Sequence, residues 1–144
     1  MKRIVSFTAC VLMSVIAFSQ SKVVAVISNV RNDKGVCHAC IFNNPASFKG
    51  ESGSPFQCLA VPVKNLVAEA VFTNVPPGTY ALFVFHDANT NQKLDKNFMG
   101  MPKEGYGASK NKLPFASAPA YNDNKFVVDG KTMVRLPIKL RNLY

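Results

Sequence analysis

The residue pattern with the clearest chemical meaning is a run of oxygen-bearing side chains that follows an apolar stretch. Asp87, Asn89, Asn91 and Asp95 stand at positions 1, 3, 5 and 9 of one segment, and the backbone carbonyl of Lys93 stands at position 7. Calcium takes six to eight oxygen ligands, and this spacing matches the first nine positions of an EF-hand-type loop. The segment therefore predicts a calcium site made by these five residues.

Two departures from that pattern predict weak binding. Gln92 stands where Gly normally permits the sharp turn, and Phe98 stands at position 12, where a bidentate Glu is usual. With only two carboxylates, the expected dissociation constant is on the order of 10⁻⁴–10⁻³ M. The alternative is an Asx-rich turn whose side chains bind their own backbone instead of a cation.

Titratable residues on both sides of this segment raise a second chemistry. His86, Asp95 and Glu104 have side chains that act as general acids or bases, so an exported hydrolase is an alternative function. No nucleophile-base-orienter spacing accompanies them. We therefore favour a supporting role, in which His86, Glu104 and Tyr106 hold the loop in place, and expect a hydrolase only if the three titratable side chains converge in a cleft.

Three cysteines beyond the first twenty residues allow either a disulfide or a metal site. Cys37 and Cys40 have the C-x-x-C spacing of redox and zinc sites. Their flanks are typical of a strand, which places the two side chains on opposite faces. We predict a disulfide from one of them to Cys58, with Cys40 as the first choice and a thiol left over. A zinc site of the three cysteines and His38 is the alternative.

Short strands must position these groups. Runs rich in Val, Ile, Tyr and Phe, separated by Gly, Pro, Asn and Asp, predict strands and a β-sandwich. No helical pattern longer than about two turns is present. The last two strands are expected to form a hairpin through Asp129-Gly130. A long segment, 87–124, is expected to be an ordered loop whose part 87–112 carries the working surface. The expected strands are 22–27, 36–42, 59–63, 66–72, 80–85, 126–128 and 132–140.

The N-terminal residues have the three regions of a secretory signal peptide. Two basic residues precede the apolar run 4–18, and the small Ala17 and Ser19 predict cleavage before Gln20. A run of about fifteen residues is too short to span a bilayer, so no stable membrane anchor is expected. The predicted organisation is a signal peptide, 1–19, and one domain, 20–144, that is secreted or periplasmic.

The charge distribution argues against one class of partner. The chain has 17 Lys and Arg against 8 Asp and Glu, a formal charge of +9 that falls to +7 without Lys2 and Arg3. The lysines are scattered and not interleaved with aromatic residues, so we expect no nucleic-acid binding. Tyr80, Tyr106 and Tyr121 could stack on sugars, but the chain lacks Trp, the usual residue of such surfaces.

A longer motif resembles a known family. It comprises Pro77-Gly78-Thr79-Tyr80-Ala81, then His86-Asp87-x-Asn89-x-Asn91-x-x-Leu94-Asp95, then Gly100-x-Pro102-x-Glu104-Gly105-x-Gly107-x-Ser109-x-Asn111. These residues resemble a secreted bacterial family of unknown function, family 2141, over Val23 to Leu140. The chain departs from the family pattern at Gln92 and at Leu113-Pro114-Phe115. The resemblance implies an immunoglobulin-like or prealbumin-like sandwich, export and no established activity.

Together these patterns predict an all-β protein with a single antiparallel β-sandwich of about seven strands and one long ordered loop. The expected function is non-catalytic binding by a monomer, with a protein or a cell-envelope glycan as the partner and with Ca²⁺ as a weakly held cofactor. Such a role is common among sandwich folds, but the fold alone does not specify it.

Overall fold

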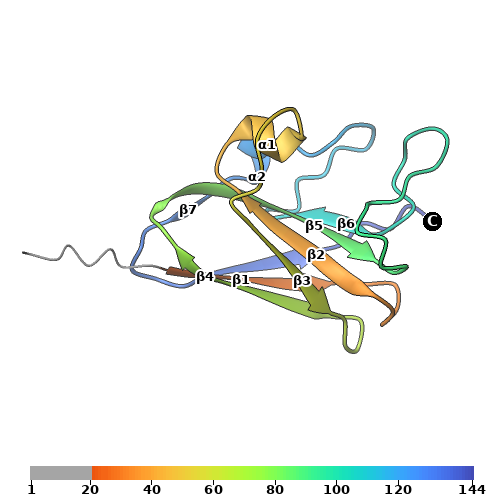
Figure 1. Ribbon diagram of the computed structural model, residues 1–144, viewed down its shortest axis with the longest axis horizontal. Coiled ribbons are helices and arrows are strands. Elements are labelled where there is room, and N and C mark those ends of the chain that lie inside the picture. The colour runs from red at the N-terminus through yellow and green to blue at the C-terminus, as the bar shows by residue number, and fades with distance from the viewer. Residues whose placement is uncertain (1–20) are drawn as a thin grey trace, which may run out of the picture.

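A computed structural model describes residues 21–144, and its strands form two stacked sheets (Figure 1). The signal peptide predicted for 1–19 lies outside the described residues. The two helices are short: α1 (Pro45–Lys49) and α2 (Tyr121–Asn124). The strands are β1 (Ser21–Ser28), β2 (Val36–Phe42), β3 (Gln57–Pro62), β4 (Ala68–Val75), β5 (Gly78–Asp87), β6 (Tyr106–Ala108), β7 (Phe126–Val128) and β8 (Val134–Lys139).

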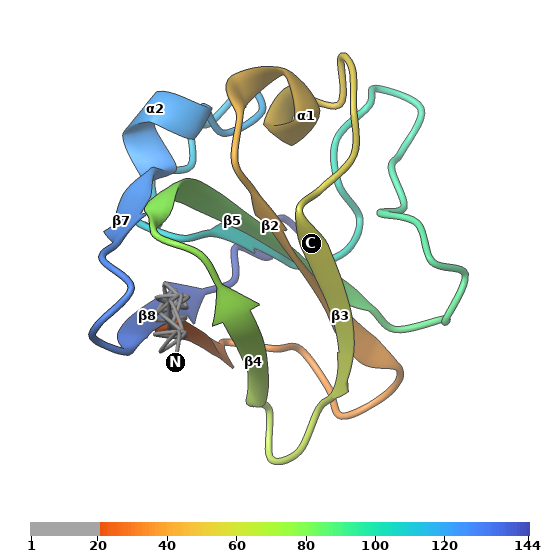
Figure 2. The same ribbon diagram turned by 60° about the vertical axis from the view of Figure 1, so that its left-hand side comes forward.

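The two sheets confirm the predicted all-β sandwich. One sheet has the order β4-β1-β8, and the other has the order β3-β2-β5-β6, with β7 also paired to β5. Figure 2 shows the sheets as separate layers, with both helices beyond the β2-β5 sheet. All but one of the strand pairs between named strands are antiparallel. The exception is β1 with β8, which run parallel.

The predicted hairpin through Asp129-Gly130 is wrong, because the two strands it joins belong to different sheets. β7 pairs with β5, whereas β8 pairs with β1. The Asp129 carboxylate accepts hydrogen bonds from the backbone N–H groups of Lys131 (2.7 Å) and Thr132 (2.8 Å). The sequence signal for a tight turn was therefore sound, but this turn carries the chain from one sheet to the other.

Three short elements lie between the strands that the sequence predicted. These are α1, β6 and α2, and β6 is the strand beyond the seven expected. The start of α1 has a local cause, because the Asn44 side chain accepts a hydrogen bond from Ser47 N (2.9 Å) and Pro45 occupies the first turn. Gly50 ends this helix at φ 74°, in the left-handed region that glycine adopts without strain.

Alternation along β2 divides its side chains between the core and the outer face of its sheet. Cys37, Ala39 and Ile41 are fully buried between the sheets, together with Phe72, Leu82 and Ile138 from other strands. His38 and Cys40 lie on the opposite, outer face. That outer face carries the site described below.

The cysteines are arranged as the sequence analysis preferred. Cys40 and Cys58 are direct partners in the β2–β3 register and form a disulfide. Cys37 is free and buried on the core side, where burial raises the pKa of its thiol to about 12. The alternative zinc site is wrong, because two of its cysteines are joined to each other and the third faces away from them.

No helix within residues 21–144 is long and apolar enough to cross a membrane.

Candidate functional site

Asp87, the last residue of β5, anchors the segment that follows it. Its side chain is fully buried, and its carboxylate accepts hydrogen bonds from the backbone N–H groups of Gln92 (2.8 Å) and Asn91 (3.1 Å). His38 Nε2 on β2 donates to the same carboxylate at 2.9 Å. The His38 ring also stacks on Phe85, with ring centroids 5.0 Å apart. One carboxylate thus ties the loop both to itself and to the neighbouring strand.

This environment favours the ionised form of Asp87. Burial by itself raises the pKa of the carboxyl group, because it removes water from the charged form. The hydrogen bonds from Gln92 N, the His38 side chain and Asn91 N act in the other direction and outweigh burial. The pKa of Asp87 is therefore held below its ordinary value.

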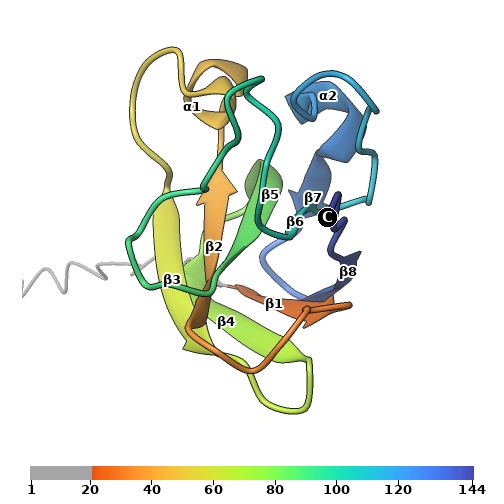
Figure 3. The ribbon, with the colours of Figure 1, turned by 90° about the vertical axis from the view of Figure 1, so that its right-hand side faces the viewer.

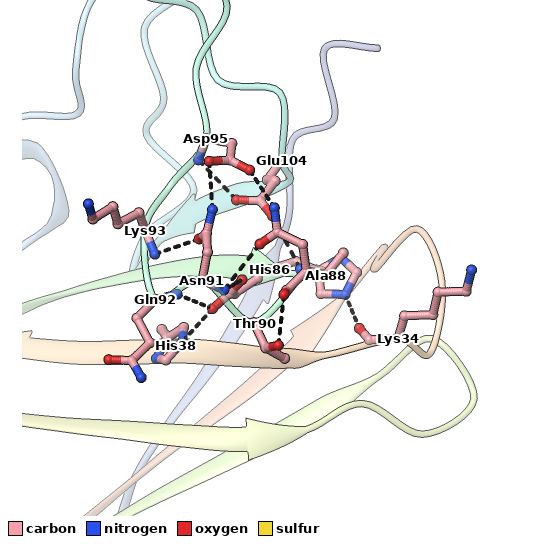
Figure 4. A network of polar contacts seen from close by, with 12 residues as sticks. Lys34, His38, His86, Ala88, Thr90, Asn91, Gln92, Lys93, Asp95 and Glu104 are labelled. Atoms are coloured by element: carbon pink, nitrogen blue, oxygen red, sulfur yellow. Dashed lines mark hydrogen bonds and ion pairs between the residues drawn. The ribbon is translucent and has the colours of Figure 1, made fainter.

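Two further predicted calcium ligands, Asn89 and Asn91, meet at a third, Asp95. Asn89 Nδ2 donates to one oxygen of that carboxylate (2.7 Å), and Asn91 Nδ2 donates to the other (2.9 Å). The side-chain oxygens of both asparagines accept backbone N–H groups, from Asn91 (3.2 Å) and from Lys93 (2.9 Å) respectively. Figure 4 shows these contacts as one network. The contacts are those of an Asx-rich turn, and they join all four predicted ligand side chains, Asp87, Asn89, Asn91 and Asp95, in one network.

Gln92 adopts the backbone conformation that the calcium-loop pattern assigns to glycine. Its φ is 64°, in the left-handed region, and Thr90 nearby has φ 59°. Left-handed geometry at a residue with a side chain costs of order 1–3 kcal/mol, which other contacts must offset. The two hydrogen bonds to Asp87 supply such contacts, so the turn forms without glycine.

The three predicted supporting residues all contact the backbone or the sheet. Glu104 accepts hydrogen bonds from Ala88 N (3.2 Å) and Asp95 N (3.0 Å), and so joins the two ends of the loop. His86 Nε2 lies 2.8 Å from the carbonyl oxygen of Lys34, in the turn between β1 and β2. Tyr106 is buried in β6, with its ring 6.4 Å from that of Phe83.

The structure does not bring the three residues of the hydrolase hypothesis into one cleft. His86 and Asp87 are consecutive strand residues, so their side chains leave β5 on opposite faces. Asp95 and Glu104 lie with Asp87 on the outer side, where they hydrogen-bond the loop.

No group of three or more His, Cys, Asp or Glu side chains in residues 21–144 is arranged to hold a metal ion. Calcium binding would therefore depend on the asparagine and backbone oxygens as well as on the carboxylates.

An apolar pocket lies beside this network, on the outer face of the β2-β5 sheet. Its volume is about 420 Å³, within the range of ligand pockets. Phe83 and Tyr106 lie at the sheet and Phe48 comes from α1. Lys49, the last residue of α1, also lines the pocket. The remaining lining comes from residues in 94–102, here called the first loop, and 115–119, part of a second loop, 113–119: Leu94, Lys96, Met99, Gly100, Met101, Pro102, Phe115, Ala116, Ser117, Ala118 and Pro119.

The first loop is held by hydrogen bonds to the Asn97 side chain and to the Asp95 carbonyl. Figure 3 shows the chain after β5 passing β2, rising beside α1 and then returning to β6. At its tip, the side-chain oxygen of Asn97 accepts hydrogen bonds from Met99 N (2.9 Å) and Met101 N (3.0 Å). Lys103 N donates to the carbonyl of Asp95 (2.8 Å). These bonds place the two methionines on the pocket.

The second loop is held from the C-terminal strand region. The guanidinium of Arg141 donates to the carbonyls of Leu113 (2.7 Å) and Pro114 (2.8 Å). Asn124, fully buried in α2, accepts Lys112 N (3.2 Å) and donates to the Lys112 carbonyl (3.0 Å). The first wall of the apolar pocket is therefore held by bonds within its own segment, and the second by bonds to the body of the domain.

Neither the place of His38 in the polar network nor the apolar pocket could be predicted from the sequence. His38 is directly opposite Phe85 in the β2–β5 register, and Asp87 is its diagonal neighbour. Strand alternation places His38 and Asp87 on the same face of the sheet. Only the register between β2 and β5 shows that their side chains are neighbours. Met99 and Phe115 lie on the pocket rim and are 69 % and 82 % exposed. Neither belongs to a polar motif, so the sequence did not mark them as functional.

Comparison with known proteins identifies a family but no characterised relative. The family model described as "Uncharacterized protein conserved in bacteria (DUF2141)" matches residues 25–135. The search of curated proteins and the search of solved structures each gave no match. The matched range includes most of the sandwich and all of the network and the apolar pocket. This chain belongs to the DUF2141 family of uncharacterised bacterial proteins.

Proposed function

We propose that this protein is an exported, non-catalytic binding module that holds an apolar group of its ligand in the apolar pocket. One observation carries the proposal: a pocket with an aromatic floor opens between two loops that expose large apolar side chains. Phe98, Met99 and Phe115 are 98 %, 69 % and 82 % exposed. Met99 and Phe115 line the same pocket. Exposed apolar surface gathered in one place marks interaction sites in folded proteins.

The tyrosines favour an apolar ligand over a cell-envelope glycan. Tyr80, Tyr106 and Tyr121 are each less than a tenth exposed, and the hydroxyl groups of Tyr80 and Tyr121 donate to backbone carbonyls. They are not presented as a surface on which sugar rings could stack. An apolar group of a protein or of a small molecule suits the apolar pocket better.

Export is the second part of the proposal. Disulfides form and persist in oxidising compartments, and the Cys40–Cys58 disulfide supports such a location. The leader predicted from residues 1–19 would deliver the chain there.

Weak calcium binding by the Asp/Asn loop, residues 87–95, remains part of the proposal as an accessory feature. The convergence of Asn89 and Asn91 on Asp95 favours it, since about a half-turn of each side-chain amide would present oxygens where nitrogens now lie. A bound cation would then replace the two amide donors as the partner of the carboxylate. Such a site would stabilise the loop beside the apolar pocket.

Hydrolase activity is the alternative, and the geometry favours it less. Glu104 accepts a hydrogen bond from Asp95 N, and Asp95 accepts one from the Asn91 side-chain amide. His86 is hydrogen-bonded to the Lys34 carbonyl. To act as acids or bases, these groups would first have to leave partners that hold the fold.

A neutral fluorescent probe tests binding in the apolar pocket. N-phenyl-1-naphthylamine carries no charge and becomes brighter in apolar surroundings, so we expect saturable enhancement with the wild-type protein. Met99→Asp should weaken binding about tenfold or more, because it puts a charge on the pocket rim. Met133→Asp is the matched control, since Met133 is 58 % exposed but lies outside the pocket. Equal binding by both variants, or no saturable enhancement with wild type, would rule the proposal out.

A further inference from the structure

We propose that the ligand of the apolar pocket is an amphipathic carboxylate, a fatty acid whose hydrocarbon chain enters the pocket and whose carboxylate lies at Lys49 and Lys96. This inference rests on the proposed function and adds the chemical class of the ligand. It comes from the pocket's combination of an apolar interior with charge of one sign.

The interior suits a flexible hydrocarbon chain. Phe48 meets Phe83 edge to face, with centroids 6.5 Å apart, and Phe83 lies 6.4 Å from Tyr106, so the floor is a continuous aromatic surface. Met99 and Met101 form part of the wall above it. Methionine is unbranched and adapts to irregular apolar shapes, which fits a chain with many conformers.

The charges on the pocket are both positive. Lys49 comes from α1 and Lys96 from the first loop, and no Asp or Glu is among the described residues that line the pocket. Lys96 has no ion-pair partner within residues 21–144. Lys49 lies 3.6 Å from Glu51, but both side chains are more than half exposed, so that contact is weak and easily exchanged.

This charge pattern discriminates among ligands that share one apolar tail. A carboxylate gains attraction from two lysines, an alcohol gains none, and a quaternary ammonium is repelled. The excess of basic residues over the whole chain acts in the same direction. The apolar interior attracts all three tails equally, so the difference among them isolates the contribution of the lysines.

The test is displacement of N-phenyl-1-naphthylamine by dodecanoate, 1-dodecanol and dodecyltrimethylammonium, each below its aggregation concentration. We expect dodecanoate to compete at about fivefold lower concentration than dodecanol, the size expected of one partly exposed ion pair, and the ammonium to compete least. Lys96→Gln should reduce the advantage of dodecanoate and leave dodecanol unchanged, and the double variant Lys49→Gln, Lys96→Gln should remove that advantage. Lys64→Gln, an exposed lysine in the β3–β4 turn, should leave both unchanged.

The outcomes separate this inference from the proposed function. Equal competition by dodecanoate and dodecanol, or an undiminished advantage in the double variant Lys49→Gln, Lys96→Gln, overturns the carboxylate inference while pocket binding stands. Failure of the probe itself to bind overturns both. A further arm uses vesicles of anionic phospholipid: capture by vesicles without competition by monomeric dodecanoate overturns the inference in favour of a membrane surface.

Discussion

At the scale of single residues, the polar side chains that stand out in the sequence hold backbone groups in place. Asp87 and Glu104 accept backbone N–H groups, and Ser109 Oγ accepts Leu82 N (3.0 Å). Sequence could predict which residues matter in this region, because Asp and Asn at alternating positions are rare outside turns and cation sites. It could not predict their partner His38, whose proximity depends on the pairing of strands far apart in the chain.

Asp87 provides a prediction about stability at this scale. Asp87→Asn removes one acceptor oxygen from a buried site with three donors, so we expect the free energy of unfolding at pH 7 to fall by about 2 kcal/mol. Asp129→Asn is the matched control, because the Asp129 carboxylate also accepts two backbone N–H groups but lies on the surface. Urea denaturation should show the smaller loss for the control, and equal losses would contradict a special role for Asp87.

The lowered pKa of Asp87 sets the pH range of this effect. A carboxyl group whose pKa is lower in the folded than in the unfolded state stabilises the fold above the unfolded value, about 3.9. That contribution is lost as pH falls through the folded value. The difference between wild type and Asp87→Asn should therefore be full at pH 7 and shrink below about pH 4, and an unchanged difference at pH 3 would contradict this account.

At the scale of elements, the strands were largely predictable and the short pieces between them were not. Hydrophobic alternation placed β2 correctly from Val36 to Phe42, because half-buried strands must alternate. β6 escaped notice because it has three residues, two glycines beside or within it, and a partner strand some twenty residues away. Asn44-Pro45 is a helix-start pattern that could have predicted α1. The surrounding Ser, Gly and Pro residues are typical of a loop, so no helix was predicted there.

One glycine fixes the start of the Asp/Asn loop. Gly35 has φ 67°, and a Cβ there would lie 2.0 Å from the carbonyl oxygen of Asp87. Gly35→Ala should therefore destabilise the fold by about 2 kcal/mol or more, combining a strained backbone with a clash against the β5 end. Gly50→Ala is the control, since φ is 74° with nothing within 4 Å of the added atom. Equal losses in thermal melts would show that the close approach does not matter.

The Asp/Asn loop supplies a second element-scale prediction. If calcium binds with a dissociation constant of about 1 mM, 10 mM calcium should stabilise the protein by about 1.4 kcal/mol and raise the melting temperature by a few degrees. Asp95→Asn should abolish the shift while sparing the fold, because Asp95 is the point where the two asparagines meet. The control is sodium chloride at equal ionic strength. No rise with calcium, or an equal rise in Asp95→Asn, would remove the calcium proposal.

At the scale of the whole molecule, the sequence predicted a sandwich but not how strands are shared between its sheets. The Asp129-Gly130 signal is local, whereas β7 and β8 are assigned to different sheets by pairing with β5 and β1. The apolar pocket could not be predicted for the same reason, because it depends on contacts between distant segments. Phe48, Met99 and Phe115 come from three segments that only the folded chain brings together, and the quoted family motif includes none of them.

Methionine methyl groups provide the most direct test of the central claim, that ligands bind in the apolar pocket held by the two loops. Met99 and Met101 line the pocket, and Met133 lies outside it. On titration of methyl-labelled protein with N-phenyl-1-naphthylamine, the account predicts that the NMR signals of Met99 and Met101 move with one saturable curve while that of Met133 stays in place. Unmoved signals for Met99 and Met101, or an equal movement of Met133, would contradict it.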